Sequence, residues 1–119
     1  MSAEFTKSVT VRPATALEGV VRVPGDKSIS HRYAMLAALA DGVSRITHYA
    51  PGNDCRSTLA CLEQLGTVVS RHDAFDRETG AKVPTIQIVG RGLRGLQTAS
   101  EDLDCGNSGS TLRMLAGIL

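Results

Sequence analysis

Long apolar runs, paired cysteines and aromatic side chains are all scarce in this chain of 119 residues. No stretch approaches the roughly 20 apolar residues that a membrane-spanning helix needs, so we expect no contact with a membrane. Tryptophan is absent, the only aromatic residues are Phe5, Tyr33, Tyr49 and Phe75, and the formal net charge is +1. With few rings for base stacking and no strong positive charge, nucleic acid is not expected as a partner.

The cysteines and histidines lack the spacing of a disulfide framework or of a metal site. Cys55, Cys61 and Cys105 are odd in number and form no C-x-x-C pair, and the histidines show no H-x-x-x-H pattern. The opening residues 1–7 have no apolar core of the kind that a secretory signal requires. We therefore expect free thiols in a reducing compartment, the cytoplasm, and no metal ion.

What remains is the composition of an ordinary globular domain, with 42% hydrophobic and 21% charged residues. Glycine and proline divide the chain into alternating strands and helices, which indicates an α/β fold. Strands are expected at 9–11, 20–23 and 44–49, a hairpin at 67–71 and 84–89, and helices at about 28–40, 53–65 and from 108 onward.

Apolar residues at helical spacing predict the buried face of each helix. In the first helix these residues are Ile29, Tyr33, Leu36 and either Leu39 or Ala40. In the second they are Cys55, Leu59, Leu62 and Leu65. The third carries Met114, Leu115, Ile118 and Leu119, and no stop signal follows them. We therefore expect an N-terminal fragment of a longer protein, and an uncovered apolar face would favour self-association.

The run P-G-D-K-S-I-S-H-R at 24–32 is the first candidate site. It places Lys27 and Ser28 at the start of a helix, with Arg32 one turn later on the same face. The free N–H groups of a first helical turn attract anions, and they carry roughly half a positive charge. Cations and a hydroxyl at that position predict a site for a phosphate or carboxylate.

The run G-N-S-G-S-T-L-R at 106–113 is the second candidate. Small residues such as Gly109 let the backbone approach a ligand closely, and Arg113 projects one turn into the following helix. Serine and asparagine at helix starts usually act as caps, so this run alone would be weak evidence for a site. Two anion-binding helix starts in one short domain suit a phosphorylated substrate, or two anionic substrates.

Two better-known phosphate motifs are excluded. A P-loop requires contiguous Gly-Lys-Ser/Thr, whereas Asp26 separates Gly25 from Lys27, and Val20 occupies the position of the earlier glycine. A dinucleotide-binding fingerprint requires a helix after its glycines, and no helical pattern follows the glycines of residues 90–95.

Residues 24–32 closely resemble the phosphate-binding signature of the EPSP synthases (3-phosphoshikimate 1-carboxyvinyltransferases), and residues 103–115 resemble a second signature of that family. The segment 53–66 also resembles the family's second helix. Ser110 stands where the family usually has threonine, and Met114 where leucine or proline is common. The resemblance implies a reaction that moves the enolpyruvyl group of phosphoenolpyruvate to shikimate 3-phosphate and releases phosphate, without metal or organic cofactor.

The same resemblance implies the roles of particular residues. Lys27 would reach both substrates, and Ser28 and Arg32 would hold shikimate 3-phosphate. Asn107 and Gly109 would contact phosphoenolpyruvate. Arg113 would order the loop or add positive potential near phosphoenolpyruvate.

The family's fold has two domains built from βαβαββ units, an inside-out α/β barrel. The resemblance implies that residues 1–22 are a strand segment belonging to the other, C-terminal domain, and that residues 23–119 are part of the N-terminal domain. The catalytic Asp and Glu of the family would lie beyond Leu119, so the fragment alone would have no complete catalytic set and no activity. Two alternatives remain open: the sister transferase acting on UDP-N-acetylglucosamine, and a non-catalytic anion-binding fragment.

Overall fold

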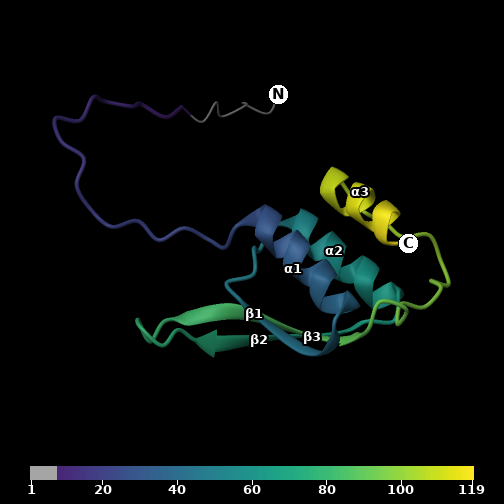
Figure 1. The fold of residues 1–119 in the computed structure, drawn as a ribbon. Helices are drawn as coiled ribbons and strands as arrows, with labels where there is room; N and C mark the ends of the chain where they lie inside the picture. Colours follow the sequence, from purple (N-terminus) through teal and green to yellow (C-terminus); the bar gives the residue numbers. More distant parts are fainter. Residues whose placement is uncertain (1–7) are drawn as a thin grey trace, which may run out of the picture.

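The computed structural model describes residues 8–119, which form three helices and one small sheet (Figure 1). The elements in order are α1 (Lys27–Leu39), β1 (Asp41–Thr47), α2 (Asn53–Gln64), β2 (Val68–Phe75), β3 (Lys82–Arg91) and α3 (Gly109–Ile118). The sheet is antiparallel with the order β1-β3-β2, so the β2–β3 hairpin is joined by β1 along the other edge of β3. The predicted α/β class and the three predicted helices are confirmed.

The helices form two layers on one face of the sheet. α1 and α2 pack on the sheet, and α3 lies on this helix pair, on the side away from the strands (Figure 1). All three helices run in the same direction, so that their N-termini gather at one end of the molecule (Figure 1). No helix within residues 8–119 is both long enough and apolar enough to cross a membrane.

The buried face of α2 is the one that the sequence predicts. Cys55, Leu59, Leu62 and Leu65 are all buried. The helix ends in a Schellman arrangement, in which the Gly66 N–H donates to the Glu63 carbonyl and the Thr67 N–H to the Leu62 carbonyl.

The predicted stripe of α1 is wrong. Ile29, Tyr33 and Leu36 are 53%, 57% and 64% exposed, whereas α1 buries small residues, among them Ala34, Ala37 and Ala38. The reason is the close approach of β3: a Cβ at Gly90 would lie 2.2 Å from the Ala37 carbonyl oxygen and 2.3 Å from that of Ala40. Only short side chains fit between backbones at this separation, so the bulky residues face outward.

The two predicted strands at 9–11 and 20–23 are also wrong for this chain. Residues 8–26 have no regular secondary structure and arch away from the body (Figure 1). Val9, Val20 and Val21 are more than 80% exposed. A strand needs a hydrogen-bonding neighbour, and the described residues offer none to this segment. Residues 1–7, on which the signal-peptide prediction and part of the segment 1–22 fall, lie outside the described residues.

Candidate functional site

The run P-G-D-K-S forms the start of α1, and its aspartate caps the helix. The Ile29 N–H donates to the Asp26 carboxylate over 2.7 Å, and the Ser30 N–H donates to the Asp26 carbonyl over 3.0 Å. The first two amides of the helix, those of Lys27 and Ser28, have no intrahelical acceptor and point out of the helix end. Two N–H groups therefore remain available to an anion.

Gly25 is required by the fold at this point. A Cβ on Gly25 would lie 1.6 Å from the carbonyl oxygen of His48, in the connection between β1 and α2. His48 itself has a positive φ of 57°. The turn before α1 thus presses directly on the chain that leads into α2, which brings the two helix starts together.

The side chain of Lys27 forms an ion pair with Asp54 in the first turn of α2. The hydrogen bond from Lys27 to Asp54, together with their opposite charges, raises the pKa of the lysine, which stays protonated at neutral pH. The Lys27 side chain is still 60% exposed. An ammonium has three N–H donors, so the ion pair leaves donors free for a second anion.

The run G-N-S-G forms the start of α3 in the same way. The Ser108 hydroxyl accepts from the Thr111 N–H over 3.1 Å and caps the helix, and the Leu112 N–H donates to the Ser108 carbonyl. The first two amides, those of Gly109 and Ser110, are left without an intrahelical acceptor. The starts of α1 and α3 therefore have the same pattern of capped and free N–H groups.

Arg113 folds back over the start of its own helix. A Cβ placed on Gly109 would lie 2.5 Å from the Arg113 Nη1 atom. The guanidinium thus occupies the space that a side chain at residue 109 would fill. It brings a positive charge beside the free Gly109 amide.

The remaining candidate residues are on the surface. Ser28, Arg32 and Asn107 are all exposed. Arg32 and Arg113 line one groove between α1 and α3, of about 360 Å³, whose other walls are mostly apolar. The structure thus brings two of the predicted cations to one groove, whereas Lys27 lies with Asp54 between α1 and α2.

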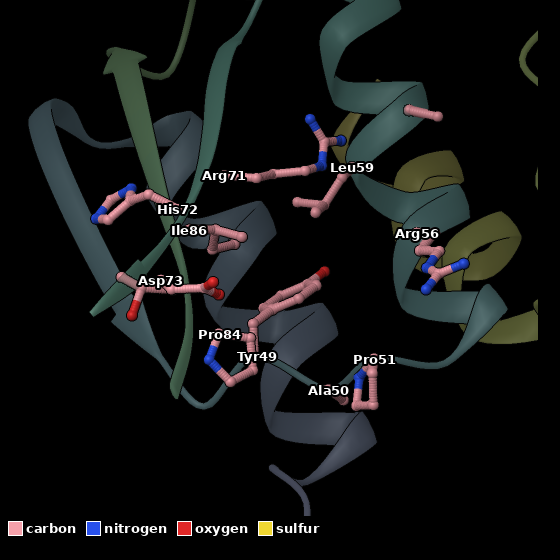
Figure 2. A pocket seen from close by; sticks show the side chains of 12 residues that line it. Tyr49, Ala50, Pro51, Arg56, Leu59, Arg71, His72, Asp73, Pro84 and Ile86 are labelled. Atoms are coloured by element: carbon pink, nitrogen blue, oxygen red, sulfur yellow. The ribbon is translucent and has the colours of Figure 1, made fainter. Parts of the chain in front are cut away.

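A larger pocket, of about 600 Å³, lies elsewhere, between α2 and the strands (Figure 2). None of the predicted site residues lines it. Its most conspicuous cation, Arg71, makes a two-pronged pair with Glu63, and the Tyr49 hydroxyl donates to the Cys55 carbonyl. These groups already have partners, so the pocket is a weaker candidate site than the helix starts.

Sequence reasoning missed Asp54 as the partner of Lys27, and it assigned no role to His31. The imidazole of His31 is fully buried and is within hydrogen-bond distance of Thr58 in α2. No spacing rule relates residues that lie on different helices, so neither contact had a signal in the sequence.

Solved structures have the same arrangement of elements. An EPSP synthase from Acinetobacter baumannii matches with a TM-score of 0.69 and 35% sequence identity, over 85% of this chain and 21% of that one. A second structure of the Acinetobacter baumannii enzyme matches with a TM-score of 0.70. The fold is therefore that of a part of an EPSP synthase.

The sequence comparisons agree with the fold. The family model of EPSP synthase (3-phosphoshikimate 1-carboxyvinyltransferase) matches residues 11–119, and the chain belongs to this family. Relatives named 3-phosphoshikimate 1-carboxyvinyltransferase include one from Koribacter versatilis, 51% identical over 95% of this chain, and one from Herpetosiphon aurantiacus, 49% identical over 92%. The chain spans 24% and 23% of the lengths of these two relatives, respectively.

Proposed function

We propose that this chain supplies part of the substrate site of an enzyme that transfers the enolpyruvyl group of phosphoenolpyruvate to shikimate 3-phosphate and releases phosphate. The observation that carries the proposal is the matched pair of helix starts, each with two free amides and a nearby cation, in a chain of the EPSP synthase family. Both substrates are polyanions, which such groups hold and orient.

Lys27 serves as a fixed cation that contacts both substrates. Its raised pKa, caused by Asp54, suits an electrostatic role and not that of a general base, because the ammonium does not give up its proton near neutral pH. Asp54 fixes the direction of the ammonium and leaves two of its three donors for substrate oxygens. Preorganised donors of this kind stabilise negative charge as it develops in the transition state.

Each of the two helix starts binds one of the substrates. The free amide and hydroxyl of Ser28, with Arg32 on the next turn, bind the phosphate of shikimate 3-phosphate. The turn of Asn107 and Gly109 binds phosphoenolpyruvate, and the Arg113 guanidinium beside Gly109 adds positive charge there. The 119-residue chain alone contains part of this site and does not catalyse the reaction.

The exposed apolar residues fit a chain that operates within a larger assembly. We propose that residues 8–22 lie on a second domain, consistent with the exposure of Val9, Val20 and Val21. In the isolated chain, the uncovered stripe of α1 would promote self-association. The free cysteines fit a cytoplasmic location, where thiols stay reduced.

Binding tests the proposal on the chain as it stands. Titration of the ¹⁵N-labelled chain with shikimate 3-phosphate is expected to shift the amide signals of Ser28 and Arg32, and phosphoenolpyruvate those of Asn107 and Gly109. Inorganic sulfate at the same ionic strength is the control for unspecific anion binding. Equal shifts with sulfate would show that the chain binds anions without specificity, and would contradict the proposal.

Catalysis requires an enzyme of the full length of the relatives. We define the hybrid enzyme as the Koribacter versatilis relative with its matching segment replaced by residues 11–119 of this chain. The proposal expects the hybrid enzyme to release phosphate from the two substrates together. A hybrid enzyme that folds, as judged by its circular dichroism, but releases no phosphate would contradict it.

A further inference from the structure

A line of buried polar side chains crosses all three helices and ends at the cap of α3. The His31 Nδ1 atom lies 2.7 Å from the Thr58 hydroxyl, which lies 2.7 Å from the Thr111 hydroxyl. The Thr111 hydroxyl donates to the Ser108 hydroxyl over 2.6 Å. His31, Thr58 and Thr111 are 0% exposed and Ser108 is 3% exposed.

The number of available protons determines which group donates and which accepts in each hydrogen bond of this line. The only hydroxyl proton of Thr111 goes to Ser108, so Thr58 must donate its own proton to Thr111. Thr58 can then only accept from His31, and the Nδ1 atom must carry the imidazole proton. The Nδ1 atom of His31 is therefore the donor in its hydrogen bond with Thr58.

The Nε2 atom of His31 strengthens this assignment. It is buried and has no hydrogen-bond partner among residues 8–119. A proton there would create a buried cation without an acceptor, which is far more costly than an unpaired lone pair. Burial and the nearby charge of Lys27 also lower the pKa of His31, in keeping with a neutral ring.

The two ends of the line adjoin the two candidate substrate segments. His31 directly precedes Arg32 and lies one turn after Lys27, whereas Ser108 lies between Asn107 and Gly109. Hydrogen bonds that are shielded from water have well-defined lengths and directions, unlike the contacts of apolar side chains. They fix how far the turn at 107–109 stands from the start of α1.

We propose that His31, Thr58 and Thr111 are positioning residues that hold the Asn107–Gly109 turn at the correct distance and angle from Lys27 and Ser28. This inference rests on the proposed function, since it assigns these residues a purpose within the same substrate site. The line does not touch substrate. It acts through the Ser108 cap, so its loss is expected to affect phosphoenolpyruvate more than shikimate 3-phosphate.

The first test asks whether His31 is the donor at its end of the line, and it uses the chain itself. Long-range ¹H–¹⁵N spectra of the imidazole rings report which nitrogen carries the proton. We expect His31 to be in the neutral Nδ1–H form at pH 8. An Nε2–H form would overturn the assignment, whether or not the hybrid enzyme is active.

The second test separates positioning from stability in the hybrid enzyme. Thr111→Val keeps the shape of the side chain but removes the hydroxyl. We expect a rise of ~10-fold in the KM for phosphoenolpyruvate, with the KM for shikimate 3-phosphate changed less than about twofold, because small misplacements of a binding group are costly. Thr111→Ser keeps the hydroxyl and should restore the original KM.

Thr85→Val is the matched control, because Thr85 is equally buried, at 2% exposure, and lies in β3 away from the line. A merely structural role for Thr111 would lower the melting temperature and leave both KM values unchanged. That result, or an equal effect of Thr85→Val on the KM for phosphoenolpyruvate, would overturn the positioning role. An inactive hybrid enzyme with residues 11–119 unaltered would instead count against the proposed function.

Discussion

Lys27, the first residue of α1, and Asp54, the second residue of α2, join their charged groups at the end of the molecule where the helices start. The pair brings a protonated lysine to a place where several backbone N–H groups are free. Its partly exposed aspartate holds the lysine without burying it. An ion pair so placed contributes little to stability, so we expect its main effect to be on ligand binding.

Replacing the aspartate tests this relationship. Asp54→Asn should lower the pKa of Lys27 towards the ordinary lysine value of 10.5, because the hydrogen bond and the opposite charge are both weakened. The pKa is measured from the ¹³Cε shift of the lysine across a pH titration. Asp73→Asn, which breaks the exposed pair with Lys82, is the matched control and should leave Lys27 unaffected. An unaltered Lys27 pKa in Asp54→Asn would show that the pair does not persist in solution.

A methyl group at the start of α3 should disturb binding without unfolding the chain. In Gly109→Ala the new Cβ would lie 2.5 Å from the Arg113 Nη1 atom, the far end of a flexible side chain, so the guanidinium moves and the backbone does not. We expect the affinity for phosphoenolpyruvate to fall about tenfold, as measured by calorimetry with the hybrid enzyme.

Gly117→Ala is the control, because its Cβ would meet nothing within 4 Å. It should raise the free energy of unfolding only slightly, because alanine favours a helix over glycine but residue 117 lies in the last turn of α3, and it should leave binding unchanged. If Gly109→Ala and Gly117→Ala bind phosphoenolpyruvate equally well, the place given to Arg113 is wrong.

The buried histidine should make stability depend on pH. The folded-state pKa of His31 lies below the ordinary value of 6.5, mainly because burial disfavours the charged ring. The unfolded chain therefore binds a proton more readily, and the free energy of unfolding falls as the pH drops below about 6.5 and is level above it. The nearby Lys27 acts in the same direction as burial, and Asp54 opposes them.

Urea unfolding of the chain at a series of pH values between 5 and 8 measures the slope of the free energy of unfolding against pH. His31→Asn should reduce it, and His72→Asn, at an exposed site in β2, should not. An unchanged slope in His31→Asn would assign the acid sensitivity to other groups.

The uncovered side of α1 should drive association of the isolated chain. Leu36 lines both the groove between α1 and α3 and a second groove between α1 and β1, and it is 64% exposed. Tyr33 lines the second groove and is 57% exposed. Leu36→Gln should shift the sedimentation of the chain towards the monomer and leave its melting temperature nearly unchanged, because this side chain is not in the core. Identical sedimentation of both chains would contradict a role of this surface in association.

Much of the fold was predictable because local rules determined it. The stripe of α2 and the hairpin follow from short-range patterns, and Ser108 caps α3 as its residue type suggests. The outward turn of Ile29, Tyr33 and Leu36 was not predictable, since it depends on how closely β3 approaches α1 at Gly90. A periodic pattern gives the existence of an apolar face but not the partner that covers it.

The candidate site likewise has some residues that short motifs reveal and others that only the packing of the helices reveals. Lys27 and Gly109 were recognisable from motifs within a few residues. The contact between Thr58 and Thr111 joins positions 53 residues apart, and each threonine by itself is an ordinary helical residue. Such pairs become visible only when the helices are placed side by side.

The most direct test of the central claim is the steady-state rate of phosphate release by the hybrid enzyme with Lys27→Ala, compared with Lys82→Ala, a lysine that is also paired with an aspartate but lies in β3. Removing a preorganised donor from the site should lower kcat/KM by ~100-fold or more, and the Lys82 variant should be unaffected. Turnover in the Lys27 variant equal to that of the unaltered hybrid enzyme would contradict the account.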